Sequence, residues 1–368
     1  MKHIIIDARL YGSKHTGIGR YTKNLLEFLS KLKSFSSYRF TLLVYPELLT
    51  EIKSDLGNKF TYYPTNIRHY SLSEQIKLPS LLSSLKPDLV HFTHLDKPIF
   101  YSGPSVVTVH DLIRHFSKGK DTTTKSPFLY WPKYFGYLLM TQHIFKSSYL
   151  IVPSNYWRDY IIEKYRFDSN RIVTTYEAVD PNFYTVDQKT TIPQSYILYT
   201  GNLYPHKNID IILQTLPQLP GIKLKIICAR SVFTGRIEKL IRKYHLINQV
   251  QFLGYVPDRQ FKKLYSHALA LIHPALIEGF SLTGLEAMSL NCPVIAANSS
   301  CLPEIYQNAV LYFNPHDSND LFKQIKKLIG NQPLRQLLVK SGHQLIKKYS
   351  WTSTAKTTLH FYQKILNA

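Results

Sequence analysis

The sequence predicts an α/β fold with two Rossmann-like domains, each built on a parallel β-sheet. The chain has 368 residues, which is longer than an ordinary single domain. Its hydrophobic content of 44% supplies enough apolar side chains for two cores. Short apolar runs alternate with longer amphipathic segments along nearly the whole chain. This alternation is typical of β-α-β units joined by right-handed crossovers.

The first half of the chain forms the predicted N-terminal domain, residues 1–184. We expect strands at 3–7, 40–45, 59–63, 89–92, 106–110, 149–153 and 171–179, and helices at about 17–32, 74–85 and 157–165. Residues 113–147 are rich in aromatic side chains and cations. We predict a helix pair there, with an outer face suited to a membrane interface and a core made by Phe135, Leu138, Leu139 and Phe145.

A polar stretch at 185–193 ends in proline and is the predicted interdomain linker. The C-terminal domain is expected to span residues 194–350, followed by a final helical segment, 351–368. We expect its strands at 196–200, 224–228, 250–256, 268–272 and 293–297, and its helices at 208–216, 235–245, 258–266, 282–290, 319–329 and 333–349.

The formal net charge of +21 indicates an anionic partner such as nucleic acid, acidic lipid or a phosphorylated substrate. We expect no nucleic acid, because the sequence has no zinc pattern, RNA-binding aromatic signature or recognition helix. The three cysteines form no CxxC pair and are expected to be reduced, as in a cytosolic protein. With no secretory signal and no apolar run near the roughly 20 residues that span a bilayer, we predict a cytoplasmic or peripheral protein.

The stretch 273–304 reads as strand, loop, helix and strand, and its loop and helix each carry a glutamate. Glu278 lies in the loop, and Glu286 follows eight residues later, about two helical turns on. Ligands of parallel α/β folds bind at the carboxyl ends of the strands. The amides of Phe280, Ser281 and Leu282 would open the helix and form an anion site. Phosphate donors beside carboxylates that accept from hydroxyl groups suit a nucleotide sugar.

Three further strand ends carry candidate residues. Gly17 and Gly19 follow the first strand and allow either close approach to a phosphate or a tight turn. In GNLYPHKN, which starts at Gly201, Lys207 can pair with phosphate oxygens or remain a solvated surface charge. His110 ends the strand VVTVH, where a structural role and a role at the site are both open.

These motifs resemble those of retaining glycosyltransferases of family 4. Glu278 begins the string EGF, Glu286 lies within GLEAM, and CPVIAAN follows; together they resemble that family's glutamate–seven–glutamate signature. TGIGRY resembles the N-terminal signature of its mannosyltransferase-like members. The resemblance covers nearly the whole chain. It implies a GT-B type fold, with two Rossmann-like domains facing across a cleft and a last helix that returns to the N-terminal domain.

The resemblance also implies roles for individual residues. His110 and Glu278 would be catalytic, lying beside the transferred sugar, and Glu286 would accept from the ribose hydroxyls. The nucleotide base would rest at 254–257. The implied donor-binding set is Gly17, Gly19, Gly201, His206, Lys207, Tyr255, Val256, Glu278, Gly279, Phe280, Ser281, Leu282 and Glu286.

The sequence departs from the family pattern at four positions. Asn202 and His206 stand where relatives carry an arginine, so neutralisation of the phosphates would rest on Lys207, backbone amides and His206. Ser281 and Thr283 replace a glycine and a proline, which indicates a variation in how the donor fits.

The predicted activity is retaining, metal-independent transfer of a hexose from a nucleotide-diphosphate sugar, with mannose from GDP-mannose favoured. No Asp-x-Asp motif is present to hold a divalent cation, and no cofactor is expected beyond the donor substrate. The resemblance implies front-side displacement, with the departing phosphate helping to deprotonate the acceptor. The expected acceptor is a saccharide, lipid-linked, at an anionic membrane surface on the inner face of the cell membrane, in synthesis of a bacterial surface polysaccharide such as lipopolysaccharide.

Two alternatives use the same fold. One is a catalytically silent scaffold in a polysaccharide assembly complex, favoured by the missing arginine and opposed by Glu278, Glu286 and Lys207. The other is a sugar phosphorylase or a nucleotide-sugar epimerase. Release of nucleotide diphosphate only in the presence of an acceptor separates transfer from these.

Overall fold

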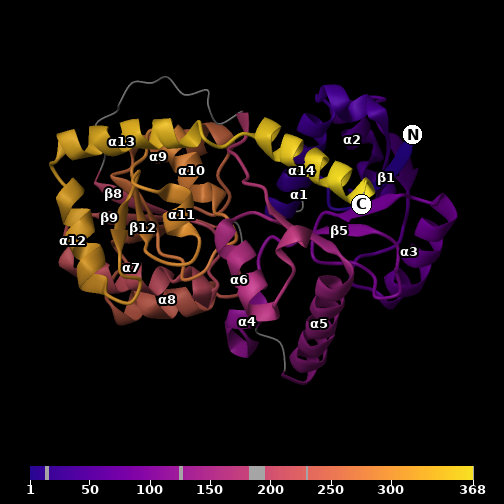
Figure 1. Cartoon of the computed structure of the whole chain (residues 1–368). Coiled ribbons are helices and arrows are strands. Elements are labelled where there is room, and N and C mark those ends of the chain that lie inside the picture. Colours follow the sequence, from indigo (N-terminus) through magenta and orange to yellow (C-terminus); the bar gives the residue numbers. More distant parts are fainter. Residues whose placement is uncertain (13–15, 124–126, 182–194, 229–230, 368) are drawn as a thin grey trace. The chain divides into compact units, whose positions relative to one another are not determined.

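The computed structural model describes residues 1–12, 16–123, 127–181, 195–228 and 231–367 (Figure 1). The predicted linker at 185–193 lies outside the described residues, and so do the predicted domain limits at 184 and 194. The chain divides into two compact units. The first combines Met1–Asp111, Phe128–Glu177 and Ser350–Ala368, and the second combines Leu112–Pro127 and Ala178–Tyr349.

The first unit contains a seven-stranded parallel sheet in the order β3-β2-β1-β4-β5-β6-β7. Its strands are β1 (Lys2–Asp7), β2 (Tyr38–Val44), β3 (Thr61–Pro64), β4 (Leu89–Phe92), β5 (Ser105–Thr108), β6 (Tyr149–Val152) and β7 (Ile172–Thr174). The α-helices of this unit are α1 (Thr16–Leu29), α2 (Leu49–Leu56), α3 (Leu72–Leu85), α5 (Pro127–Ser147), α6 (Asn155–Tyr165) and α14 (Trp351–Leu366). Each strand predicted here is present, whereas α2 was not predicted.

The second unit contains a six-stranded parallel sheet in the order β10-β9-β8-β11-β12-β13. Its strands are β8 (Tyr196–Thr200), β9 (Lys223–Ile227), β10 (Val250–Phe252), β11 (Ala270–His273), β12 (Val294–Ala297) and β13 (Leu311–Phe313). Its α-helices are α4 (Ile113–Phe116), α7 (Ile209–Thr215), α8 (Thr234–Lys243), α9 (Asp258–His267), α10 (Leu282–Ser289), α11 (Leu302–Tyr306), α12 (Ser318–Leu328) and α13 (Gln332–Ile346). The short elements β13 and α11 were not predicted.

Both sheets are buried at their centres, which directs polar side chains to the strand ends. Ile4, Ile5 and Ile6 in β1 have no exposed surface, and β11 and β12 are buried along their whole length. Parallel strands covered on both faces leave no solvent-facing row of side chains. In each sheet the strand order reverses beside the first strand of the unit, β1 or β8. The carboxyl edge at such a reversal is where ligands of this fold class bind.

The final helix, α14, belongs to the first unit and packs on α1. The Tyr362 hydroxyl lies 2.5 Å from His91 Nδ1, and the Trp351 and Tyr21 ring centroids are 6.1 Å apart. Burial lowers the pKa of His91 to about 3, so this imidazole is neutral in the core. The last helix therefore completes the hydrophobic core of the N-terminal sheet.

A buried ionic cluster joins β1 to α3. Arg9 Nη2 lies 2.6 Å from Asp7 Oδ2 and 2.6 Å from Glu74 Oε1, and all three side chains are fully buried. Burial opposes ionisation of Asp7, but the Arg9 guanidinium outweighs it and holds the pKa of Asp7 below its usual range. For Glu74, burial and the nearby Asp96 prevail and raise its pKa to about 8. The cluster thus holds more carboxylates than cations.

Helix α5 exposes an apolar stripe instead of burying it. Phe128, Phe135 and Leu139 are 89%, 61% and 63% exposed, and Trp131 lies in the same stripe. The prediction that Phe135 and Leu139 are core residues is therefore wrong, whereas Phe145 is buried as expected. The helix packs through another face, on which Tyr134, Tyr137 and Met140 are buried. Within the described residues, no helix is both long and apolar enough to cross a membrane.

Helix α10 packs so tightly that one of its positions accepts only glycine. A Cβ atom at Gly284 would overlap the ring of Tyr306, whereas a Cβ at Gly235 in α8 would meet nothing within 4 Å. We expect Gly284→Ala to destabilise the second unit by about 1–3 kcal/mol, the cost of overpacking a core. Gly235→Ala should instead stabilise it by about 0.5–1 kcal/mol, because alanine loses less backbone entropy. Chemical denaturation of both variants checks this contrast, and equal effects would contradict it.

Candidate functional site

Lys207 and Glu278 form an ion pair at the carboxyl edge of the second sheet. Lys207 Nζ lies 2.8 Å from each Glu278 carboxylate oxygen. Lys207 ends a 3-10 turn after β8, and Glu278 lies in the loop after β11, a neighbouring strand. Burial opposes ionisation of Glu278, yet Lys207 and His273 together hold its pKa below the usual range. Two residues singled out separately in the sequence therefore meet, and the carboxylate is ionised.

A hydrogen-bond network that includes His273 and Tyr306 positions the Glu278 carboxylate. His273 Nε2 lies 2.9 Å from Glu278 Oε1, and His273 Nδ1 lies 2.8 Å from the Tyr306 hydroxyl. The Tyr306 hydroxyl also contacts Ser281 Oγ at 2.8 Å and accepts from the Gly284 amide at 3.1 Å. These side chains come from β11, α10 and α11. The network positions the carboxylate, and sequence analysis missed His273 and Tyr306 as parts of the site.

Helix α10 begins at Leu282, as predicted, and points its amino end into this edge. Ser281 precedes it with φ +78°, a left-handed conformation, and its side chain does not cap the helix. A glycine at this position would adopt that conformation without strain. Phe280 is buried and Gly279 half-buried in the loop. Glu286 lies in the second turn of α10 and is 6% exposed, so the second glutamate is also largely buried.

His206 and Gly201 complete the loop after β8. Burial, reinforced by Lys207, lowers the pKa of His206 to about 4. His206 is therefore neutral near pH 7 and can offer a phosphate a hydrogen bond but no positive charge. Its carbonyl accepts from the Leu276 amide at 2.8 Å, which ties the β8 loop to the β11 loop. Gly201 has φ +140°, a backbone conformation that favours glycine.

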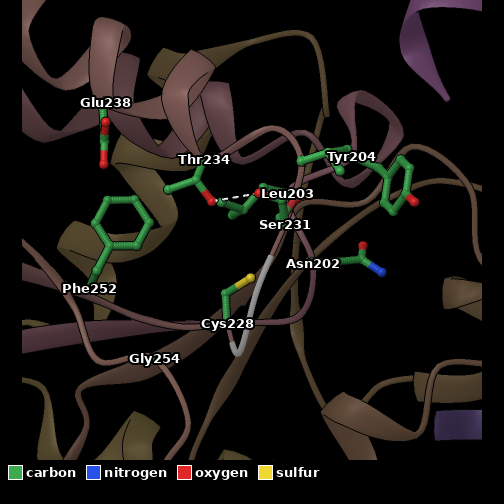
Figure 2. A pocket seen from close by; sticks show the side chains of 10 residues that line it. Asn202, Leu203, Tyr204, Cys228, Ser231, Thr234, Glu238, Phe252 and Gly254 are labelled. Atoms are coloured by element: carbon green, nitrogen blue, oxygen red, sulfur yellow. Dashed lines mark hydrogen bonds between the residues drawn. The ribbon is translucent and has the colours of Figure 1, made fainter. Parts of the chain in front are cut away.

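A cavity of about 730 Å³ opens at the carboxyl ends of β8, β9 and β10 (Figure 2). Its lining consists of Asn202, Leu203, Tyr204, Cys228, Ser231, Val232, Thr234, Glu238, Phe252 and Gly254. Figure 2 shows Glu238 and Phe252 on one side and Asn202 and Tyr204 on the other. The Thr234 hydroxyl donates to the Ser231 carbonyl at 2.9 Å and orders the loop after β9.

The cavity reaches the predicted base-binding turn at Gly254, but its walls differ from those expected. The Tyr255 side chain is 78% exposed and Val256 is buried, and the lining includes neither. Phe252, Thr234 and Glu238 line the cavity instead, and sequence analysis missed them. Their positions in the sequence could have indicated them, because Phe252 ends a strand, β10, and Thr234 begins a helix, α8. Both positions lie at the edge of the sheet where ligands of this fold bind.

The first unit holds the remaining candidates. His110 lies two residues beyond β5, with Nε2 2.9 Å from the Thr93 carbonyl and Nδ1 3.5 Å from Glu177 Oε1. Burial disfavours its charged form, but the Glu177 carboxylate and the Thr93 carbonyl outweigh burial and raise the pKa of His110. Gly17 and Gly19 lie in the first turn of α1, where Gly17 is exposed and a Cβ would meet nothing within 4 Å.

Two family models match the chain and together span most of it. The model described as Glycosyltransferase Family 4 matches residues 15–183, and the model described as Glycosyl transferases group 1 matches residues 185–345.

Curated relatives and solved structures agree with these matches. O-antigen chain mannosyltransferase B of Escherichia coli is 27% identical over 95% of this chain and 96% of its own length. O-antigen chain mannosyltransferase RfbU of Salmonella typhimurium is 25% identical over 88% of this chain and 90% of its own length. Sucrose-phosphate synthase from Thermosynechococcus elongatus, 16% identical over the full length of both chains, superposes with a TM-score of 0.74. The Anabaena protein HepE, in complex with UDP and glucose, also superposes with a TM-score of 0.74. It is 15% identical over 99% of this chain and all of its own length.

The two parallel-sheet Rossmann-like units and these matches lead to one conclusion: the chain is a glycosyltransferase with the GT-B fold and belongs to the group 1, family 4 glycosyltransferases.

Proposed function

We propose that this enzyme transfers mannose from GDP-mannose to a saccharide acceptor in the synthesis of a bacterial surface polysaccharide. The observation that carries the proposal is the ion pair of the half-buried Lys207 with the buried Glu278, in the loop that leads into α10 and its buried Glu286. The names of two relatives, both O-antigen mannosyltransferases, support mannose as the sugar and O-antigen assembly as the setting.

The 730 Å³ cavity is the proposed site of the nucleoside. Phe252, which is 36% exposed, offers an aromatic face to a purine ring. The Glu238 carboxylate is an acceptor, and it matches the adjacent N–H donors of guanine better than the acceptor-rich edge of uracil. Glu286 would then accept from the ribose hydroxyls.

The proposed chemistry is substitution at the anomeric carbon with retention, without a metal ion. The glycosidic C–O bond to the diphosphate breaks, and Lys207 and the α10 amides stabilise the negative charge that develops on the leaving oxygen. The acceptor oxygen forms the new bond on the same face, and its proton passes to the departing phosphate. Glu278 would hold the transferred sugar. In the first unit, Thr93 and Glu177 orient the imidazole of His110, to which we give the second catalytic role.

The proposed acceptor is lipid-linked and is presented at an anionic membrane surface on the cytoplasmic side. The exposed stripe on α5 supplies the apolar contact, and the formal net charge of +21 supplies attraction to acidic lipid.

A catalytically silent scaffold is the second candidate. It is favoured by the neutral state of His206 at a position where relatives carry an arginine, because Lys207 is then the main cation available to the phosphates in this loop.

Calorimetric titration with GDP-, UDP- and ADP-sugars in the absence of added metal tests the donor. We expect GDP-mannose to bind selectively, and Glu286→Ala to weaken it at least tenfold through loss of the ribose contact. Glu238→Gln should reduce the preference for GDP- over UDP-sugars, because an amide cannot accept two N–H donors in the same way.

Lys239→Gln serves as the matched control, since Lys239 is the exposed neighbour of Glu238 in α8. If none of the nucleotide sugars binds the wild-type protein, the scaffold candidate takes the place of the transferase.

The ionisation of His110 gives a pH prediction. Because its pKa is raised in the folded state, the His110–Glu177 pair stabilises the fold fully below the unfolded value near 6.5, and this stabilisation is lost as pH rises through the folded pKa. Glu177→Gln should therefore lower the His110 pKa in an NMR titration and lower the melting temperature more at pH 5.5 than at pH 8.5. His91 is an internal control, because its pKa near 3 keeps it neutral throughout. An unchanged His110 titration would refute the pairing.

Vesicle cosedimentation tests the α5 stripe. We expect Phe135→Ser with Leu139→Ser to reduce binding to vesicles rich in acidic lipid several-fold, and salt to weaken binding of the wild type. Ile247→Ser with Leu337→Ser, which alters two exposed apolar residues of the second unit, should bind like the wild type. Equal loss in both double variants would point to nonspecific adsorption.

A further inference from the structure

Three potential metal ligands that were given no role above gather in the first unit. His69 lies in the loop after β3, and His94 and Asp96 lie in the loop after β4. One ligand atom from each lies within 4.8 Å of the other two. His94 is 2% exposed and Asp96 is fully buried, while the His69 side chain is 7% exposed. The cluster therefore lies inside the fold, with His69 at its more accessible side.

The polar atoms of this cluster lack the partners that buried groups normally have. Among the described residues, neither ring nitrogen of His94, neither carboxylate oxygen of Asp96, nor Nε2 of His69 has a hydrogen-bond partner. The shortest approach inside the cluster is 3.4 Å, between His94 Nε2 and Asp96 Oδ2. Burying such groups without partners destabilises the folded state. One nitrogen of each imidazole and the carboxylate of Asp96 could share a single missing partner.

The dimensions and orientation suit a metal ion. Bonds of about 2.0–2.2 Å from a central ion to nitrogen and oxygen place neighbouring ligand atoms roughly 3–4 Å apart. His69 Nδ1 lies 2.7 Å from the Tyr45 hydroxyl, and the His69 amide donates to the same hydroxyl at 3.1 Å. Such an outer contact is the usual means of orienting a metal-binding imidazole, and it leaves Nε2 as the ligand atom.

The charge of the surroundings also favours a cation. Asp7 Oδ2 lies 3.8 Å from His69 Nε2, and Asp7 is joined through Arg9 to Glu74. Two buried carboxylates, those of Asp7 and Asp96, therefore lie in a region whose cation is the guanidinium of Arg9, while the raised pKa of Glu74 favours its uncharged form near neutral pH. Lys97, the next residue after Asp96, points its ammonium at Ser147 and Ser148 instead. A divalent ion would balance the excess negative charge.

We infer that His69, His94 and Asp96 bind one divalent transition-metal ion. Two imidazoles and one carboxylate form a donor set that zinc accepts readily, and calcium or magnesium would prefer oxygen ligands. These ligands are not among the residues to which a role in binding the diphosphate is proposed.

The ion would join the loop that follows β3 to the loop that follows β4. Thr93, which precedes His94, donates through its hydroxyl to the Asp7 carbonyl at 2.8 Å and holds His110 through its own carbonyl. An ion bound to His94 would therefore fix the backbone that orients His110. The effect on His110 is one of positioning, since the cluster itself is buried.

The test is zinc binding by full-length protein that has been stripped with a chelator. We expect equilibrium dialysis with elemental analysis to give one zinc per chain, and zinc to raise the melting temperature. Cobalt substitution should give d–d absorption bands typical of a four- or five-coordinate site. His69→Gln and Asp96→Asn should each weaken zinc binding at least tenfold and abolish the zinc-dependent rise in melting temperature.

Two control variants separate this cluster from chance binding elsewhere. His360→Ala removes an exposed histidine of the first unit, and Cys228→Ser removes the half-buried thiol, and both should bind zinc like the wild type. Circular dichroism verifies that each variant is folded, and His69→Gln, at the accessible side, provides the test if Asp96→Asn fails to fold. Absence of stoichiometric binding, or binding unchanged in His69→Gln, would overturn the inference and leave His94 and Asp96 as a plain buried ion pair.

Discussion

The pairing of Lys207 with Glu278 is the interaction on which the candidate site depends. Lys207 follows β8 and Glu278 follows β11, and these strands are neighbours in the sheet, so the pair joins two loops that are far apart in sequence. A buried carboxylate without a cation would take up a proton. Lys207 therefore keeps Glu278 ionised, and His273 and Tyr306 keep it in place. A donor diphosphate that drew Lys207 toward itself would change the charge around Glu278 at the same time.

The same physical constraint places polar groups at the edges of both sheets. Strands buried on both faces have no room for unpaired polar side chains along their length, so these residues collect where strands end. In the second unit this edge holds the Lys207–Glu278 pair and the cavity. In the first it holds His110, the Asp7–Arg9–Glu74 cluster and the His69–His94–Asp96 cluster.

Apolar patterns in the sequence were sufficient to predict most strands and helices, but they did not predict which side chains are buried. Apolar runs located nearly all the strands, and the short elements β13 and α11 escaped because three to five residues carry little periodicity. The α5 stripe was misjudged because an aromatic residue has the same sequence signature on a core face and on an exposed one. Glu278 and Lys207 were found from motifs, whereas the cavity residues Phe252, Thr234 and Glu238 belong to no motif and become visible only when three strand ends are brought together.

By itself the sequence determined the fold class and the family and singled out the main candidate residues, since strand–loop–helix periodicity and short motifs are local properties of the chain. Tertiary structure decided which of those residues meet. The bond between Lys207 and Glu278 spans 71 positions, and His69 meets His94 although the strands that precede them, β3 and β4, are separated in the sheet by β2 and β1. The tertiary structure also decided the ionisation of His206, His110 and Glu278. Burial and neighbouring charges set the pKa of a side chain, and both depend on the fold and not on the residue type.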